Sequence, residues 1–176
     1  MKDILLVVDM QNDFVSGTLG TKEAETIVEK AVNKIKNFKG SVFFTQDTHS
    51  ASYLNSQEGK LLPIVHCIKN TKGWELVEPI KKLANKNIYE KNSFGSLTLA
   101  ETLKKLNEEE SLSSITLIGI CTDICVVSKA ILLKTFLPEV KISVDISCCA
   151  GTTPENHNHA AAVMRMCQIN IENESV

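Results

Sequence analysis

The sequence predicts an α/β fold: a three-layer α/β/α arrangement around a mostly parallel, doubly wound, Rossmann-like sheet. Three observations lead to this prediction. Short apolar runs of strand length alternate along the chain with segments whose apolar residues recur at helical spacing. The first run, ILLVV at 4–8, is continuously apolar, as expected of a strand buried on both faces of a parallel sheet. No internal repeat, low-complexity segment or linker interrupts the alternation, so residues 1–176 are expected to form one domain.

The first half of the chain contains three expected strands and two expected helices. ILLVVD at 4–9 is a strand that ends in an acid, and SVFFTQD at 41–47 is another of the same kind. Between them, residues 22–38 carry apolar side chains at helical spacing, and Thr21 precedes them as a suitable N-cap. The remaining expected elements of this half are a helix at 74–84 and a short strand at 87–91.

The second half continues the alternation of strands and helices. Leucines at helical spacing predict one helix, and Thr153 followed by Pro154 is typical of the start of another. Apolar runs of strand length separate the helical segments. In chain order, the expected elements are a helix at 96–109, a strand at 114–120, a helix at 122–136, a strand at 140–146, a helix at 154–166 and a strand at 168–171.

Composition and charge narrow the class of protein. The chain is 43% hydrophobic and 23% charged, and its net charge of -2 with no basic tract argues against a nucleic-acid partner. No apolar run approaches the roughly 20 residues of a membrane helix, so no membrane partner is expected. The N-terminus lacks a small-residue cleavage site, and the six cysteines include no C-x-x-C pair. We therefore expect a cytoplasmic protein with reduced cysteines.

Charged and nucleophilic residues follow the expected strands. Asp9, Asp47 and Lys91 end three of them, and CTDIC at 121–125 follows a fourth. In open parallel sheets, ligands bind at the carboxyl ends of the strands, so these residues are expected to share one site. The irregular stretch 48–73 is longer than an ordinary connection and is expected to be a functional loop or lid.

Cys125 is the strongest candidate for a nucleophile. It falls in the first turn of the expected helix at 122–136, where unpaired N–H groups and the helix dipole stabilise a thiolate or an oxyanion. A nearby lysine would lower the thiol pKa further, and such a thiolate attacks carbonyl carbons. The alternative is that Cys121 and Cys125 are simply buried core residues. A metal clip or a redox pair is disfavoured, because the stretch has only two soft ligands and lacks C-x-x-C spacing.

Asp47, His49 and His66 form a candidate metal site. Asp47 and His49 are separated by one residue directly after a strand, and His66 lies further along the same irregular loop. Carboxylate and imidazole ligands suit zinc, and also iron or manganese. The alternative is a polar loop that contains two histidines by chance.

Four motifs, in order along the chain, resemble those of the isochorismatase-like cysteine hydrolases, the superfamily that includes the nicotinamidases. LLVVDMQNDF at 5–14 resembles the family's first strand with its D-x-Q-N-D-F signature, and TQDTH at 45–49 resembles the D-x-H after the second strand. EKNSFGSL at 90–97 resembles the lysine motif, and GICTDICV at 119–126 resembles the nucleophile motif G-x-x-T-D-x-C-V. The resemblance implies an isochorismatase-like fold and a cysteine hydrolase of the nicotinamidase-like branch.

The resemblance also implies specific catalytic residues. Asp9, Lys91 and Cys125 match the family's triad, in which the lysine stabilises the thiolate and the aspartate moves the proton. The bond between Ile120 and Cys121 would be a cis peptide. The backbone N–H groups of Cys121 and Cys125 would then form the oxyanion hole.

A metal cofactor follows from the same resemblance. In nicotinamidases an aspartate, two or more histidines and sometimes a glutamate bind a divalent ion. Asp47, His49 and His66 match this set, and Glu58 is a further candidate because its spacing is similar to that in some members. The cofactor implied is a divalent metal, zinc before iron or manganese, and it would hold the pyridine nitrogen of the substrate.

The chain departs from the nicotinamidase pattern where the substrate ring would be held. Thr48 stands where many members have a tryptophan, and KLLPIVHC at 60–67 lacks the Trp-Pro that often precedes the second metal histidine. Phe14 remains as one wall of the substrate pocket, and Trp74 is the single tryptophan of the chain. Each aromatic pair that is missing removes about 0.5–1.5 kcal/mol beyond the effect of buried area.

The expected function is hydrolysis of a small amide C–N bond through a thioester acyl-enzyme, with nicotinamide to nicotinate plus ammonia as the leading case. One alternative is another hydrolase of the family, acting on an N-carbamoyl or ureido compound or on isochorismate. The isochorismatase alternative is disfavoured because it leaves the metal-ligand set without a role. Another alternative is a non-catalytic module that binds a small ligand. The expected partner is a small-molecule amide, and apolar helices together with family habit favour a homo-oligomer.

Overall fold

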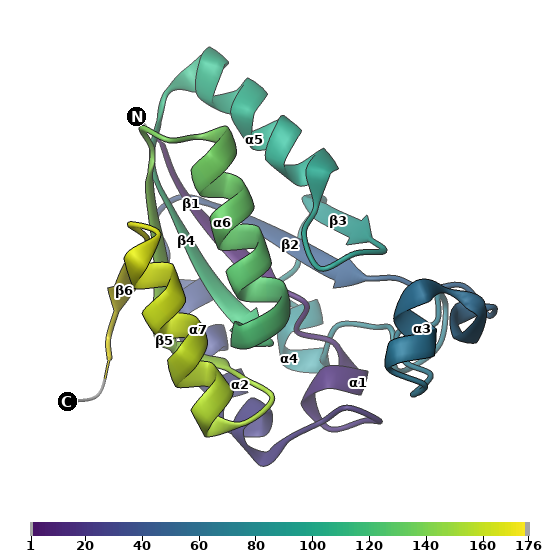
Figure 1. Cartoon of the computed structure of the whole chain (residues 1–176). Helices are drawn as coiled ribbons and strands as arrows, with labels where there is room; N and C mark the ends of the chain where they lie inside the picture. Colours follow the sequence, from purple (N-terminus) through teal and green to yellow (C-terminus); the bar gives the residue numbers. More distant parts are fainter. Residues whose placement is uncertain (1, 175–176) are drawn as a thin grey trace.

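The computed structural model describes residues 2–174 and confirms the predicted three-layer α/β/α fold (Figure 1). Its centre is a six-stranded sheet in the order β3-β2-β1-β4-β5-β6, in which every neighbouring pair is parallel. This is a doubly wound order, because the chain builds outward in both directions from the middle of the sheet. The strands are β1 (Lys2–Val8), β2 (Ser41–Asp47), β3 (Ile88–Lys91), β4 (Leu112–Ile120), β5 (Lys141–Ala150) and β6 (Asn170–Glu172).

Helices cover both faces of the sheet. They are α1 (Asn12–Val15), α2 (Lys22–Asn37), η1 (Tyr53–Asn55), α3 (Gln57–Leu61), α4 (Glu78–Lys81), α5 (Leu97–Glu110), η2 (Thr122–Val126), α6 (Val127–Phe136) and α7 (Pro154–Met166). α5, α6 and α7 pack on one face, whereas α1, α2 and α4 pack on the other (Figure 1). α3 lies on a lobe beside the carboxyl end of β2. Within residues 2–174, no helix has the length and apolar character needed to cross a membrane.

The first strand shows why the apolar runs form the middle of the sheet. In β1, Ile4, Leu6 and Val8 belong to the core beneath α5, α6 and α7, whereas Leu5 and Val7 belong to the core beneath α2. All five side chains are fully buried. Successive residues of a strand point to opposite faces, so a strand covered by helices on both faces is apolar throughout.

α2 confirms the prediction of a capped, amphipathic helix. The side-chain oxygen of Thr21 accepts a hydrogen bond from the N–H of Ala24 at 3.0 Å, which satisfies one of the unpaired donors of the first turn. Ala24, Ile27, Ala31 and Ile35 are buried, at spacings of three and four residues. This stripe packs against the sheet and leaves the charged face of the helix in solvent.

Two predicted helices differ from those observed. The helix predicted at 74–84 is reduced to the single turn of α4, because the preceding backbone pairs with the segment after β1. There the N–H of Asn12 donates to the carbonyl of Glu75, and the N–H of Val77 donates to that of Met10. The helix predicted at 122–136 begins with the π-helical turn η2 and becomes α-helical only in α6.

The direction of chain winding reverses between β1 and β4, and Gly119 makes the close approach of these strands possible. Its φ is +121°, a conformation that favours glycine, and a Cβ at this position would collide with the carbonyl oxygen of Val8. Asp9 follows β1 at this point, and Cys121 follows β4. The close approach therefore brings two of the predicted site segments side by side.

Candidate active site and metal centre

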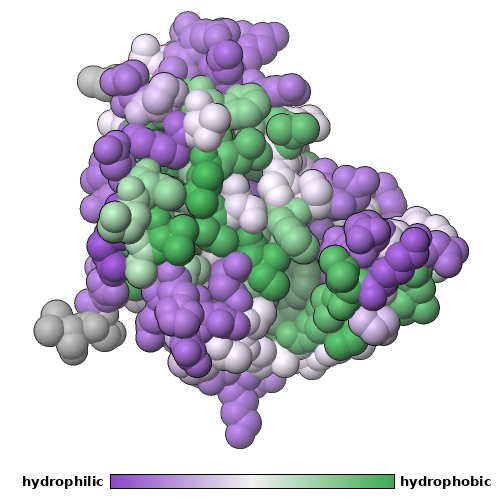
Figure 2. Space-filling view, in the orientation of Figure 1, coloured by the Kyte–Doolittle hydropathy of each residue, from purple (hydrophilic) through white to green (hydrophobic). Residues whose placement is uncertain are grey.

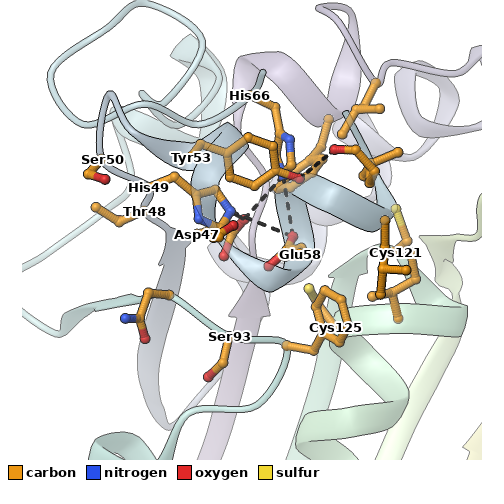
Figure 3. Close-up of a pocket in the computed structure, with 18 of the residues that line it drawn as sticks. Asp47, Thr48, His49, Ser50, Tyr53, Glu58, His66, Ser93, Cys121 and Cys125 are labelled. Carbon is orange, nitrogen blue, oxygen red and sulfur yellow. Dashed lines mark hydrogen bonds and ion pairs between the residues drawn. The ribbon is translucent and has the colours of Figure 1, made fainter. Parts of the chain in front are cut away.

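A cavity of about 1440 Å³ opens at the carboxyl ends of the strands. Figure 2, in the orientation of Figure 1, shows hydrophobic side chains at the centre of the visible surface and on the lobe that carries α3. In Figure 3 the labelled side chains approach the cavity from the end of β2, from the lobe and from η2. The predicted site residues that line it are Phe14, Asp47, His49, Glu58, His66, Cys121 and Cys125.

Lys91 contacts both other members of the predicted triad. Its Nζ lies 3.0 Å from Asp9 Oδ2 and 3.6 Å from Cys125 Sγ. The same ammonium lies 2.8 Å from Asp47 Oδ1, and all four side chains are buried. Burial by itself lowers the pKa of Lys91, but the charges of Asp9, Cys125 and Asp47 outweigh it and hold that pKa well above its usual value. Lys91 is therefore a fixed positive charge beside the thiol.

Asp9 is held through both of its carboxylate oxygens. Oδ1 accepts a hydrogen bond from Thr45 Oγ1 at 2.6 Å, and Oδ2 lies 3.0 Å from Lys91 Nζ and 3.2 Å from Lys129 Nζ. Burial raises the pKa of Asp9, but Lys129 and Lys91 outweigh burial and lower that pKa below its usual value. The backbone φ of Asp9 is +47°, which is uncommon for a residue other than glycine. Asp9 is thus an oriented anion.

The charge state of Cys125 differs from the expectation. Burial, followed by the negative charge of Asp9, raises the pKa of the Cys125 thiol to about 12, while Lys129 and Lys91 oppose the rise. The prediction of a lowered pKa was therefore wrong, because desolvation in the core outweighs the neighbouring lysines and the start of the helix. A thiol with this pKa is protonated at neutral pH. Attack by its sulfur requires a base to take the proton.

The turn η2 brings both cysteines of the motif to the cavity. The peptide bond between Ile120 and Cys121 is cis, as the resemblance implies. The N–H groups of Ile124 and Val126 donate to the carbonyl of Cys121 at 3.1 and 3.0 Å. These bonds close the turn η2, which contains Cys125, and α6 follows directly after it. Cys121 and Cys125 both line the cavity.

Lys129 was not among the residues predicted from the sequence, yet it belongs to this cluster. Its side chain is 2% exposed, its Nζ lies 3.2 Å from Asp9 Oδ2, and it donates to the carbonyl of Phe94 at 3.0 Å. The sequence feature that could have identified Lys129 is its position four residues after Cys125, which places both residues on one face of a helix. A lysine in a helix is ordinarily exposed to solvent, so the pattern alone did not single it out.

The four predicted metal ligands lie together (Figure 3). Asp47 Oδ2 lies 2.8 Å from His49 Nε2 and 3.6 Å from His66 Nε2. Glu58 Oε1 lies 3.7 Å and 3.8 Å from the same two nitrogens. One ligand atom from each residue falls within 4.8 Å of the others. Glu58 comes from α3, so the irregular stretch after β2 completes the set.

The chemistry of these donors fits a divalent metal ion. His49 Nε2 is buried and has no aligned hydrogen bond within residues 2–174, although Asp47 Oδ2 is 2.8 Å away. His66 Nδ1 bonds the carbonyl of Ile64 at 2.8 Å, which leaves Nε2 as the free ligand atom on the cluster side. Burial raises the pKa of Asp47, but the neighbouring imidazoles of His49 and His66 and the charge of Lys91 lower it far below its usual value. Two imidazoles and two carboxylates suit zinc, iron or manganese.

Gln11, from the D-x-Q-N-D-F signature, fixes the backbone of a candidate metal ligand. Its Oε1 accepts a hydrogen bond from the N–H of Asp47 at 2.7 Å, and its Nε2 donates to the Asp47 carbonyl at 2.8 Å. The same amide also donates to the carbonyl of Trp74 at 2.8 Å. Gln11 is fully buried. These two bonds connect the end of β2 to the segment after β1, so they fix the position of Asp47 relative to that segment.

The aromatic walls of the cavity differ in part from those considered from the sequence. Phe14 lines the cavity, and its ring centroid is 5.5 Å from that of His66. Tyr53 of η1 also lines the cavity, and it is a wall residue that was not predicted. Trp74 is not among the described lining residues, because its indole N–H donates to Thr48 Oγ1 at 2.8 Å. Thr48, which stands where many nicotinamidases have a tryptophan, thus holds the indole ring of Trp74 in place.

Comparison with known proteins decides the family. The model of the isochorismatase domain matches residues 3–174. This chain belongs to the isochorismatase family. The predicted resemblance, including its nicotinamidase-like branch, is confirmed by this match and by the relatives and solved structures. The chain is an isochorismatase-family hydrolase.

The relatives and the structural neighbours agree with this family. The Bacillus subtilis (strain 168) protein described as "Uncharacterized isochorismatase family protein PncA" is 33% identical over 144 residues, which are 74% of this chain and 78% of the relative. The crystal structure of the nicotinamidase/pyrazinamidase PncA from Bacillus subtilis matches with a TM-score of 0.82 and 27% identity, over 98% of this chain and 100% of that one. The pyrazinamidase of Pyrococcus horikoshii in complex with zinc has the same fold, with a TM-score of 0.81, 23% identity and coverage of 99% and 100%.

Replacing His66 by alanine should weaken zinc binding. The substitution removes one of four clustered donors, so the affinity should fall by at least roughly 100-fold, because even loss of a residue that only supports a ligand costs about 10–100-fold. The measurement is a zinc titration of metal-free protein in competition with a chelator. His159→Ala is the matched control, because His159 is an exposed histidine outside the cluster. Equal affinities for the His66→Ala and His159→Ala proteins would contradict the metal assignment.

Alkylation of Cys125 by iodoacetamide should keep accelerating between about pH 7 and pH 10 in the metal-free protein. A thiol with a pKa of about 12 gains thiolate roughly tenfold for each pH unit in this range, because it remains mostly protonated throughout. The measurement is peptide mass spectrometry after timed labelling, with the exposed Cys167 as the reference for reagent access. A rate that levels off below about pH 8 would instead show a lowered pKa.

Proposed function

We propose that this chain hydrolyses a small amide, with nicotinamide converted to nicotinate and ammonia, through a thioester on Cys125. The observation that carries the proposal is the contact of one buried ammonium, Lys91 Nζ, with Asp9, Cys125 and Asp47. It joins a nucleophile and a metal-ligand candidate that line the cavity to Asp9, a buried base that is not among the lining residues. The Bacillus subtilis nicotinamidase/pyrazinamidase, similar over nearly the whole chain, supports an amide of this class as the substrate.

In the first half of the reaction, Asp9 accepts the proton of the Cys125 thiol as the sulfur attacks the carbonyl carbon of the amide. The raised thiol pKa makes this transfer necessary, and the ionised state of Asp9 makes it possible. The backbone N–H groups of Cys121 and Cys125 would hold the resulting oxyanion, and a single such donor is worth about 2.7–4 kcal/mol. Asp9 then gives its proton to the amide nitrogen, the C–N bond breaks, and ammonia leaves a thioester on Cys125.

In the second half, water hydrolyses the thioester. Asp9 accepts a proton from the water as its oxygen attacks the thioester carbon, and the C–S bond then breaks. The sulfur regains that proton from Asp9, and the product acid releases its own proton to solvent and leaves the cavity as a carboxylate. Lys91 stays protonated throughout, since its pKa is raised well above its usual value, and it stabilises the negative charge that develops on sulfur.

Asp47, His49, Glu58 and His66 would hold a divalent metal ion, zinc in the first place and iron or manganese as alternatives. When bound, such an ion supplies a Lewis acid for the pyridine nitrogen of the substrate and positions for water. The Pyrococcus horikoshii pyrazinamidase was solved in complex with zinc. For this chain the assignment depends on its own donor set, above all on the buried His49 nitrogen that lacks an aligned hydrogen bond within residues 2–174.

A second candidate substrate is an N-carbamoyl or ureido compound, cleaved at its C–N bond by the same residues. The composition of the walls favours keeping this alternative. Leu61 and Leu62 line the cavity where a tryptophan often precedes the second metal histidine, and Trp74 bonds Thr48 instead. A cavity with fewer aromatic walls selects less strongly for a flat ring. The chemistry at Cys125 is the same for both substrate classes.

A homo-oligomer and a cytoplasmic location remain predictions. Large apolar side chains are exposed on several elements: Met166 is 86% exposed, Leu61 79% and Leu97 63%. Exposed apolar side chains that gather into a patch are typical of a surface that contacts another protein or copy. These three residues lie on α7, α3 and α5, and the measurement that tests self-association is the oligomeric state in solution.

Substitution of Cys125 by alanine should abolish ammonia release while the protein stays folded, because the change removes only the nucleophile and creates a small cavity. Release of ammonia is measured for wild-type and variant proteins with nicotinamide, pyrazinamide, N-carbamoyl compounds and isochorismate, with and without a chelator. Cys167→Ala, at an exposed cysteine, is the matched control and should retain wild-type turnover.

Two outcomes would contradict the proposed function. An active Cys125→Ala protein together with an inactive Cys121→Ala protein would show that the other thiol is the nucleophile. Turnover of isochorismate alone, unchanged by chelator, would replace the amidase assignment with vinyl-ether hydrolysis and would leave the metal cluster without a catalytic role.

A further inference from the structure

Lys129 is a second buried lysine at the proposed active site. It lies on α6, one helical turn after Cys125, and only 1% of it is exposed. Its Nζ lies 3.2 Å from Asp9 Oδ2 and donates to the carbonyl oxygen of Phe94 at 3.0 Å. Both partners lie far away in sequence, so the ammonium connects α6 to the segment after β1 and to the segment after β3.

A buried ammonium is costly unless a carboxylate or several hydrogen bonds compensate for its lost hydration. Asp9 supplies the carboxylate and Phe94 supplies a fixed acceptor. The charges of the cluster then balance, because Asp9 and Asp47 are opposed by Lys91 and Lys129. Without Lys129, two carboxylates would share the single ammonium of Lys91 beside a buried thiol.

The contacts of Lys129 also restrict the orientation of Asp9. Thr45 holds Oδ1, and the two lysines approach Oδ2. Lys91 is divided between Asp9 and Asp47, so it constrains the Asp9 carboxylate less than a dedicated partner would. The carbonyl of Phe94 keeps the Lys129 ammonium from following any movement of that carboxylate. Of the two lysines that contact Asp9, Lys129 is therefore the one that makes no contact with the metal-ligand candidates.

We propose that Lys129 is a positioning residue for the hydrolysis. It acts through Asp9, which it holds in the orientation that accepts the proton of Cys125, and it supplies the second positive charge of the cluster. This inference rests on the proposed function, and it assigns a role to a residue outside the triad and outside the metal-ligand set. A misplacement of about 1 Å in a reacting group can lower a rate roughly 100-fold, so the loss of this support should be visible in turnover.

The test compares Lys129→Met with Lys134→Met, a matched change on the same helix at a lysine that donates to the carbonyl of Pro138 at 2.9 Å. In Lys129→Met, kcat for nicotinamide should fall about 10- to 100-fold, whereas KM should change much less, because Lys129 does not line the cavity. Lys134→Met should match the wild type in both constants. The thermal midpoint and the bound zinc of each protein are measured to confirm folding and an intact metal cluster.

A second readout separates this inference from the proposed function. Lys129 opposes the rise of the Cys125 thiol pKa, so Lys129→Met should raise that pKa further and slow alkylation of Cys125 by iodoacetamide about tenfold at a fixed pH near 9. This measurement needs no substrate. If the wild type hydrolyses none of the amides yet alkylation slows in Lys129→Met alone, the proposed function fails and the placement of Lys129 stands.

The inference is overturned if folded, zinc-replete Lys129→Met keeps the wild-type kcat and the wild-type alkylation rate. A lower thermal midpoint with both rates unchanged would show that Lys129 serves only the stability of the fold. An equal fall of kcat in Lys134→Met would show that the effect belongs to α6 as a whole.

Discussion

One buried ammonium holds the site together. Lys91 Nζ lies 3.0 Å from Asp9, 2.8 Å from Asp47 and 3.6 Å from the sulfur of Cys125. Two carboxylates and a lysine are each costly to bury alone, so the three charges stabilise one another only when the ends of β1, β2 and β3 come together. The same contact connects the proposed chemistry at Cys125 with the proposed metal site at Asp47. The proposed catalysis and the proposed metal binding would therefore depend on a shared group.

The order of the strands explains how residues distant in sequence reach this contact. In the sheet, β3, β2, β1 and β4 are successive neighbours, and Lys91, Asp47, Asp9 and Cys121 stand at or just beyond their carboxyl ends in the same order. All the strands are parallel, so these ends lie at one edge of the sheet. α6, which follows β4 and η2 and packs on one face of the sheet, then brings Lys129 to Asp9. A doubly wound sheet thus supplies both the positions of the charged groups and the cover that keeps water from them.

Much of the fold and most of the proposed site could be predicted from the sequence, because strand alternation and motifs at strand ends are local signals. Asp9, Lys91 and Cys125 belong to such motifs, and the structure places them in contact. Other features depend on packing between segments that no local pattern reveals. The raised thiol pKa of Cys125 follows from desolvation by the assembled core, whereas the helix terminus alone suggested a lower value. Lys129 has the pattern of a surface lysine, and its burial becomes visible only when α6 is packed against β1. The path of 48–73 depends on long-range bonds, such as the one between the N–H of Cys67 and the carboxylate of Asp13.

The most direct test of the shared ammonium is the rate of ammonia release per bound zinc in the Lys91→Met protein. Methionine has a similar length and no charge, so it removes the contacts to Asp9, Asp47 and Cys125 together. If Lys91 stabilises the charge that develops on the sulfur, turnover per zinc-replete site should fall by at least roughly 100-fold, comparable to the loss of one oxyanion donor. Wild-type turnover in a Lys91→Met protein that retains its zinc would contradict the central claim.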